Sequence, residues 1–316
     1  MTTNTNFWFR TFFQLNIYKA SGEEFQRLFE DIMEYRYPDF QSVAPWGNWG
    51  DGGNDGWIPS EKRYFQVYGP KINTPSNPVK ATEKLIEDFQ KLKHKWSDIE
   101  CYHFVYNDRF NKMPAPIGKA LADLQNQYHL QEATPFSVGK LEKTFMELTD
   151  DQKMIIVGAI PAEIPDSIDP RAIGELLTHL ANQETQLLNF LDETAPDFQE
   201  KIKFNGLSQP ISGYLNSYSY QTQYIDDFLQ YRDIGLAQIC AVEMHSIYLN
   251  SRKEIPEQTE NAPNLRYVWM IEQLIPPVAH NHPHTLKAYR EAAQVILAKY
   301  FESCDAYEHP NNITTS

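Results

Sequence analysis

The 316-residue chain has few cysteines, no long apolar run and less positive than negative charge. Its three cysteines, Cys101, Cys240 and Cys304, are odd in number and widely spaced, which argues against a disulfide framework and a zinc site. No apolar run approaches the roughly 20 residues of a membrane span. The first residues also lack the basic start and apolar core of a signal peptide. These absences predict a cytoplasmic protein without a membrane partner.

A nucleotide-binding Gly-x-x-x-x-Gly-Lys loop is also missing, so any ATPase activity is expected to come from a partner. The chain has 28 Lys and Arg residues against 42 Asp and Glu residues, a net charge of −14. Residues 1–133 contain 15 Lys and Arg residues against 17 Asp and Glu residues, and residues 134–316 contain 13 against 25. Because phosphate contacts need Lys and Arg, we expect the first region to contact any nucleic acid and the acidic second region to meet protein.

The most informative segment is rich in glycine: residues 47–69 contain six of the fourteen glycines, with Asp51 and Asp55 among them. Glycine permits close backbone approach and positive φ. A predicted strand over residues 64–68 follows, with Gln66 at its middle. An Asp entering one strand and an acceptor midway along the next could bind a hard divalent cation through oxygens. The alternative is that both Asp residues only form turns, as Asp and Gly commonly do.

A helix with one apolar face is predicted upstream of this segment. Ser21 and Glu24 have the spacing of a capping box, with Ser21 as N-cap. Apolar residues then recur at helical spacing, at Phe25, Leu28, Phe29, Ile32 and Met33. Glu30 lies beside this stripe and is expected to point toward the Asp55 loop, and Pro38 is expected to stop the helix.

The first region has the pattern of an α/β domain. A helix starting at Asn77-Pro78 separates the strand at residues 64–68 from a second strand at residues 101–106, an order that implies parallel pairing. A helix over residues 116–128 and a turn at Thr134-Pro135 are expected to close the domain.

The second region is predicted to be mostly helical. Expected helices cover residues 138–148, a segment starting at 149–152, residues 171–191, one or two helices within 214–249, and two last helices separated by Pro276-Pro277. The sequence therefore predicts two domains, residues 1–133 and residues 134–316. The second is expected to be a helical accessory or adaptor domain.

Three segments together resemble a known nuclease family. Phe29-Glu30, the loop from Gly50 to Gly56 and Phe65-Gln66-Val67-Tyr68 are similar to the Mrr-like branch of the PD-(D/E)xK restriction-endonuclease fold. The resemblance implies a mixed sheet flanked by helices and a Mg²⁺- or Mn²⁺-dependent endonuclease that acts on DNA. It assigns Glu30 to the helix acid, Asp55 and Gln66 to the metal, and the Val67 carbonyl to a further ligand.

The family's lysine falls on Tyr68 here, and Lys71 is the nearest candidate replacement. A lysine would stabilise negative charge on the reacting phosphate, which a neutral phenol does poorly. Two interpretations follow from this departure. The domain is either an active nuclease or a catalytically inactive nuclease-fold subunit that binds nucleic acid or scaffolds a complex.

The C-terminal end carries a second resemblance. Residues 293–310 are similar to the closing helix of C-terminal modules from ABC-three-component bacterial defence systems. This resemblance implies an effector subunit of an anti-phage or anti-plasmid complex, with an ABC/SMC-like ATPase as partner. The adaptor domain is expected to dock the nuclease-like domain to that partner or to a second copy of the chain.

Overall fold

The computed structural model describes residues 3–44, 52–71, 78–96, 98–161, 168–183, 198–230, 234–303 and 306–308. The chain divides into two compact units. The α/β unit is Phe13–Ile156, and the helical unit combines Met1–Phe12 with Val157–Ser316. Helix α1 (Thr3–Lys19) therefore begins in the helical unit and ends in the α/β unit.

The α/β unit is built on a five-stranded mixed sheet in the order β1-β2-β3-β4-β5. Its strands are β1 (Gln41–Ser42), β2 (Gly56–Ile58), β3 (Arg63–Tyr68), β4 (Cys101–Tyr106) and β5 (Glu132–Ser137). The first three strands pair antiparallel, whereas β3, β4 and β5 pair parallel. The predicted parallel pairing of β3 and β4 is confirmed, with Gln66 opposite Phe104.

The predicted turn at Thr134-Pro135 is wrong, because both residues lie inside β5. Proline lacks a backbone N–H and is tolerated on an edge strand, and β5 is the last strand of the sheet. The predicted boundary between residues 133 and 134 thus falls within this strand. The two compact units divide instead between Ile156 and Val157.

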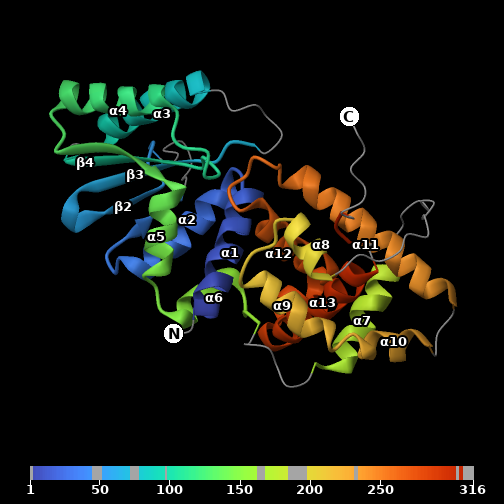
Figure 1. Cartoon of the computed structure of the whole chain (residues 1–316). Coiled ribbons are helices and arrows are strands. Elements are labelled where there is room, and N and C mark those ends of the chain that lie inside the picture. Colours follow the sequence, from blue (N-terminus) through green and yellow to red (C-terminus); the bar gives the residue numbers. More distant parts are fainter. Residues whose placement is uncertain are drawn as a thin grey trace, which may run out of the picture. The chain divides into compact units, whose positions relative to one another are not determined.

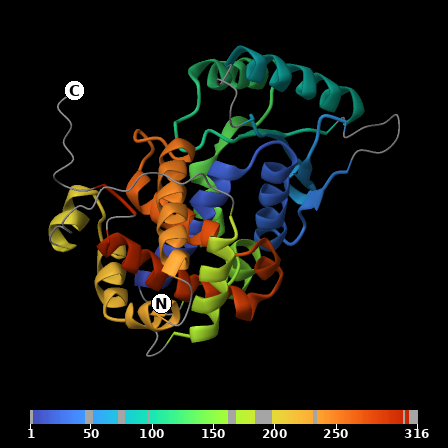
Figure 2. The same cartoon turned by 90° about the vertical axis from the view of Figure 1, so that its right-hand side faces the viewer.

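Helices cover both faces of the sheet (Figure 1). One face carries α2 (Glu23–Arg36) and α5 (Val138–Met146), and the other carries α3 (Pro78–Lys95) and α4 (Ala115–Tyr128). Helices α3 and α4 lie side by side (Figure 2). The short α6 (Asp150–Val157) ends the α/β unit, and a 3₁₀ turn at Pro59–Glu61 connects β2 to β3.

The helix predicted after Ser21 is present as α2, and most features predicted for it are confirmed. The five residues of the apolar stripe are all buried. The helix ends at Arg36, because Tyr37 before Pro38 is extended, with φ −124° and ψ 105°. The predicted N-cap at Ser21 is wrong. Gly22 occupies that position with φ 52°, which no side chain would tolerate easily, and no side chain caps the helix.

Successive residues of β3 point to opposite faces of the sheet. Phe65 faces α2, with 5.4 Å between its ring centroid and that of Phe29. Tyr64 belongs to the core under α3 and α4, together with Tyr102 and Phe104 of β4. Gln66 and Tyr68 follow Tyr64 by two and four residues, so their side chains point to the same face of the sheet, toward α3.

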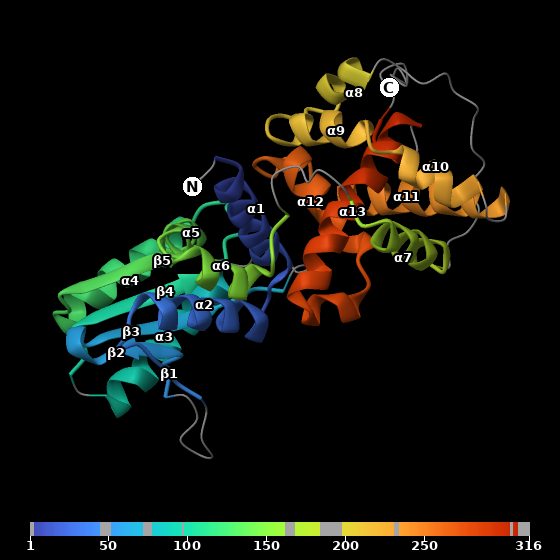
Figure 3. The same ribbon diagram turned by 90° about the horizontal axis from the view of Figure 1, so that it is seen from below.

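The helical unit contains α7 (Pro170–Ala181), α8 (Phe198–Phe204), α9 (Ile211–Ser219), α10 (Gln223–Gln230), α11 (Ile234–Glu254), α12 (Ala262–Leu274) and α13 (Pro283–Glu302). Helix α13 lies against α7, α9 and α12 (Figure 3). The segment 214–249 forms parts of three helices rather than one or two, since α9 ends at Ser219 and α10 at Gln230. Part of the predicted helix 171–191 lies outside the described residues.

The break at Pro276-Pro277 is confirmed, with a 3₁₀ segment at Pro277–Asn281 between α12 and α13. Within the described part of the chain, no helix combines the length and apolar character that crossing a bilayer requires.

Candidate metal-binding site

Asp55 lies at the end of the glycine-rich loop, immediately before β2. Its backbone N–H donates to the Phe65 carbonyl at 2.9 Å, which ties the loop to β3. The loop needs glycine at Gly53, where φ is 76° and a Cβ would come within 2.1 Å of the Asp88 carbonyl oxygen on α3. Glycine thus lets the loop lie directly on α3. Asp51, the other acid of the motif, lies outside the described residues.

The structure brings Asp55 and Gln66 into direct contact. Asp55 Oδ2 accepts a hydrogen bond from Gln66 Nε2 at 2.7 Å and another from the Val67 backbone N–H at 2.6 Å. Both side chains are buried, with exposed fractions of 4% for Asp55 and 3% for Gln66. The contact places Asp55 on the α3 side of the sheet with Gln66.

Several buried polar atoms near this pair lack hydrogen-bond partners among the described residues. They are Gln66 Oε1, Asn54 Nδ2 and the Tyr102 hydroxyl. Burial raises the pKa of Tyr102 well above its ordinary value, and the charges of Asp88 and Asp55 raise it further. Because unpaired buried polar groups are rare, this cluster is a candidate place for a bound polar ligand or ion.

Asp88 is the acid that sequence analysis missed. It is 2% exposed on α3, and its carboxylate lies 2.6 Å from Lys84 Nζ and 3.0 Å from Lys91 Nζ. One signal in the sequence indicates it, since Asp88 interrupts the apolar face formed by Leu85, Phe89 and Leu92. A carboxylate in an apolar helix face needs a buried partner.

Glu30 is not part of this cluster. It lies on α2, the helix that covers the opposite face of the sheet, and its Oε1 accepts a hydrogen bond from Gln26 at 2.8 Å. The side chain borders a hollow of about 310 Å³ that also includes Val43. Burial raises the pKa of the Glu30 carboxyl, an effect that the Gln26 hydrogen bond partly opposes.

Tyr68 and Lys71, the two candidates for the missing positive charge, differ in position. Tyr68 lies on the α3 side of β3, and its ring stacks on Tyr106 with 5.8 Å between centroids and an interplanar angle of 6°. Lys71 is exposed, three residues further along the chain. On α3, Lys84 and Lys91 are the cations paired to the buried Asp88.

The donor set can be compared with what a divalent cation needs. Mg²⁺ prefers oxygen ligands, usually one or two carboxylates supplemented by other oxygens. Asp55 supplies a carboxylate, and Gln66 Oε1 is a buried carbonyl oxygen without a hydrogen bond in the described structure. These two residues fit such an ion once the Gln66 amide turns its oxygen toward Asp55. Among the described residues, no group of three or more His, Cys, Asp or Glu side chains is placed to bind a metal.

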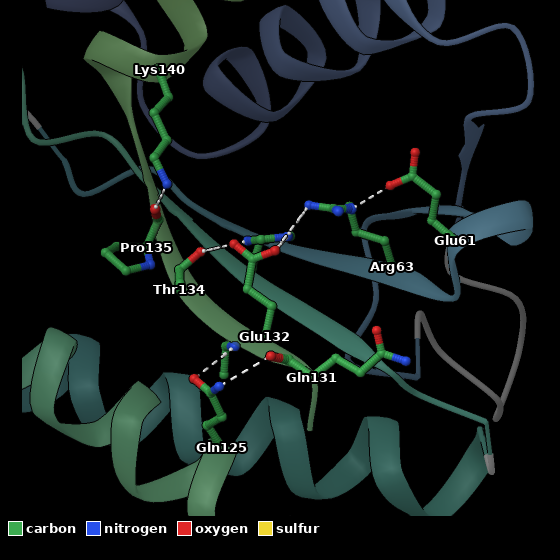
Figure 4. Close-up of polar contacts among 10 residues, drawn as sticks. Glu61, Arg63, Gln125, Gln131, Glu132, Thr134, Pro135 and Lys140 are labelled. Carbon is green, nitrogen blue, oxygen red and sulfur yellow. Dashed lines mark hydrogen bonds and ion pairs between the residues drawn. The ribbon is translucent and has the colours of Figure 1, made fainter. Parts of the chain in front are cut away.

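A second polar network lies at the start of the three parallel strands (Figure 4). Arg63 Nη1 donates to His103 Nε2 at 2.8 Å, and His103 Nδ1 contacts Thr134 Oγ1 at 3.0 Å. Thr134 Oγ1 donates to Glu132 Oε1 at 2.9 Å, and Glu132 Oε2 accepts from Arg63 at 3.4 Å. These contacts form a closed network that requires a neutral His103, because an imidazolium has no lone pair to accept a hydrogen bond from Arg63.

Protonation of the buried His103 is expected to destabilise the folded protein in acid. Burial lowers the pKa of His103 from 6.5 to about 4, with Glu132 acting in the opposite direction and Arg63 and Lys140 adding to the decrease. The pKa of His103 is thus lower in the folded than in the unfolded protein. Its contribution to the free energy of unfolding is therefore complete above about pH 6.5 and is lost as pH falls toward about 4. The expected loss is at most about 3 kcal/mol.

Urea unfolding of the wild type and of His103→Gln between pH 7.5 and 4 measures this contribution. We expect the free energy of unfolding to fall less steeply with acid in the variant, which lacks the titrating imidazole. Equal pH dependence in both proteins would show that His103 does not contribute.

A family of known domains matches part of the chain. Residues 171–308 match the family model of C-terminal domain 10 of the ABC-three component systems. The match supports membership in those systems. It includes all but the last two residues of the segment 293–310 that resembled these systems in sequence, and it lies within the helical unit. No curated protein and no solved structure matches the chain.

Proposed function

We propose that this chain is the nuclease-like subunit of an ABC-three component defence assembly, in which Asp55 and Gln66 bind Mg²⁺ or Mn²⁺ for phosphodiester hydrolysis in DNA. The match of residues 171–308 supports the association with such systems. The observation that carries the nuclease proposal is the contact between Asp55 and Gln66, together with Gln66 Oε1, which has no hydrogen-bond partner in the described part of the chain.

Each residue would have a distinct role in this site. Asp55 supplies the anionic ligand, and Gln66 supplies a neutral oxygen after rotation of its amide. When bound, the cation would act as a Lewis acid on the phosphate. Tyr68 cannot supply positive charge, so we assign electrostatic stabilisation to Lys84 and Lys91, the two lysines paired to Asp88 on the adjacent helix.

The second candidate function is a nuclease fold without catalysis, which binds nucleic acid or scaffolds the assembly. Two observations favour it. Asp55 Oδ2 already accepts two N–H donors in a buried position, so these bonds stabilise the loop without an ion. The acid of α2, Glu30, also lies on the helix that covers the other face of the sheet.

DNA cleavage separates the two functions. We expect the protein, purified with an ABC-type ATPase partner, to nick or degrade DNA in the presence of Mg²⁺ or Mn²⁺. Asp55→Asn keeps the side-chain volume but removes the anionic ligand, so activity should fall about 100-fold or more. Undiminished cleavage by Asp55→Asn would place the active site elsewhere, and a well-folded wild type without cleavage would favour the non-catalytic function.

Gln66→Glu tests the ion without relying on activity. The substitution places two carboxylates in buried contact, which repel each other unless one is protonated or a cation lies between them. We expect a lower melting temperature than wild type at pH 8 in EDTA and recovery in Mg²⁺ or Mn²⁺. Gln127→Glu, an exposed change on α4 with the same charge, is the matched control. Equal metal responses of the two variants would argue against a site at Asp55.

The helical unit is assigned the adaptor role in this proposal. This unit, Met1–Phe12 with Val157–Ser316, contains 11 basic and 21 acidic residues, and a surface of that charge repels nucleic acid but steers basic protein partners. We therefore propose that the helical unit docks the α/β unit to the ATPase or to a second copy of the chain.

A further inference from the structure

A second polar hollow lies in the helical unit and is independent of the proposed nuclease site. It has a volume of about 220 Å³, and its lining includes Arg252, Arg266 and Tyr307. Two acids, Glu257 and Glu308, lie at the same hollow. The hollow thus combines two guanidinium groups, a phenol and two carboxylates within the region that matches C-terminal domain 10.

Tyr307 is held in an unfavourable backbone conformation inside this hollow. Its φ is 75°, in the left-handed region that bulky residues seldom occupy. Asn205 holds the next residue in place, because its side chain accepts from the Glu308 N–H at 3.0 Å and donates to the Glu308 carbonyl at 2.9 Å. Such strain persists only where the surroundings enforce it, and it often accompanies function.

Among the described residues, the Tyr307 hydroxyl is a donor without an acceptor. The residue is 5% exposed, and its ring packs on Tyr248 and Phe301 with 5.2 Å between centroids in both pairs. The hydroxyl has no hydrogen-bond partner among the described residues. Burial raises the pKa of Tyr307 well above its ordinary value, so the proton stays on the oxygen at neutral pH.

The two arginines differ in how firmly they are placed. The Arg266 side chain is only 8% exposed, and its Nε and Nη2 donate to the Ile255 carbonyl at 2.9 and 2.7 Å. Its Nη1 donates at 3.0 Å to Glu257, whose side chain is 69% exposed. Arg252 pairs with Glu308, and both side chains are 43% exposed. Both carboxylate partners are therefore in contact with solvent, and another carboxylate can replace them at little cost.

We propose that this hollow binds a carboxylate group, with the Tyr307 hydroxyl and the guanidinium groups of Arg252 and Arg266 as donors. Arginine and a carboxylate match in planar geometry, and the internal partners of both arginines are already carboxylates. Glu257 and Glu308 disfavour a phosphate, because its larger negative charge would meet two acids at close range. The carboxylate belongs either to a free small acid or to an acidic peptide.

Thermal unfolding of the full chain in succinate, in an acetylated peptide ending in Asp-Glu and in inorganic phosphate tests the proposal, with NaCl at equal ionic strength as reference. A ligand that binds the folded state raises the melting temperature in a saturable way. We expect a saturable rise with succinate, the peptide or both, and a smaller rise with phosphate. Succinate alone would identify a free acid as the source, and the peptide alone would identify a protein segment.

Two variants locate the binding. Tyr307→Phe removes only the unpaired hydroxyl, so without ligand its melting temperature should equal or exceed that of wild type. Its carboxylate affinity should fall about tenfold. Arg252→Gln should also weaken binding about tenfold. Arg36→Gln in the α/β unit is the matched control, since Arg36 is 42% exposed and pairs with Glu147.

Four results would overturn the assignment. They are no response beyond that to NaCl, a stronger response to phosphate than to carboxylates, equal losses in Arg252→Gln and Arg36→Gln, or wild-type affinity in Tyr307→Phe. A lower melting temperature of Tyr307→Phe without ligand would show that the hydroxyl has a structural partner, and this would also overturn the proposal.

Discussion

Replacing Asp55 with alanine should destabilise the α/β unit by about 3 kcal/mol, independently of any catalytic effect. The substitution leaves two buried donors, Gln66 Nε2 and the Val67 backbone N–H, without their acceptor. Each unsatisfied buried group costs roughly 1–3 kcal/mol. Urea unfolding at neutral pH, followed by circular dichroism, measures the loss.

Asp55→Asn should cost clearly less, because the asparagine carbonyl oxygen can accept from both donors. Asp123→Ala provides the surface control, since Asp123 is exposed on α4 and its loss should stay within about 0.5 kcal/mol. If Asp55→Ala were as stable as this control, Asp55 would not be the buried acceptor described here. Comparing Ala with Asn also separates lost hydrogen bonds from lost charge, which the activity measurement alone cannot do.

The largest destabilisation in the helical unit is expected from Arg290→Met, at about 3–5 kcal/mol. Arg290 is 2% exposed and makes a two-pronged ion pair with Glu272, at 2.8 and 3.0 Å. It also donates to the Ala159 carbonyl at 2.6 Å and lies 3.8 Å from the centroid of the Phe12 ring. Removing the cation leaves Glu272, only 10% exposed, without its main counter-charge.

The double variant Arg290→Met with Glu272→Met should recover part of this loss. Breaking a buried pair leaves an uncompensated charge, whereas replacing both partners with apolar residues removes it. Lys287→Met on the same helix is the control, because Lys287 is 47% exposed and lies 3.9 Å from Glu291. Its cost should be below about 1 kcal/mol. A double variant no more stable than Arg290→Met would contradict this account of the ion pair.

The proposed nuclease function and the proposed carboxylate binding depend on different residues of the chain. The first depends on Asp55 and Gln66 in the α/β unit, and the second on Tyr307 and two arginines in the helical unit. Loss of DNA cleavage in Asp55→Asn would leave carboxylate binding intact. Loss of binding in Tyr307→Phe would leave metal-dependent stability unchanged.

The sequence by itself determined the elements whose residues carry a local pattern. The helical spacing of the α2 stripe requires one buried face, and Pro38 prevents continuation of the helix. The run of apolar residues in β4 predicts a strand buried on both faces, and all six of its residues are buried. The order of strand, helix and strand then fixes the parallel pairing of β3 and β4. The sequence of the glycine-rich loop and the following strand also predicted Asp55 and Gln66 as a pair, and the structure places these two side chains in contact.

Only the tertiary structure decided which distant residues share a site. The Asp55 loop meets the backbone of Asp88 at Gly53 because α3 packs on one face of the sheet, while α2 carries Glu30 to the other. The same holds for Thr134-Pro135, whose local turn signal was overridden by pairing with β4. Residues Met1–Phe12 likewise join the helical unit through contacts such as Trp8 with Tyr214. These outcomes depend on packing between segments far apart in the chain, and local composition does not encode such packing.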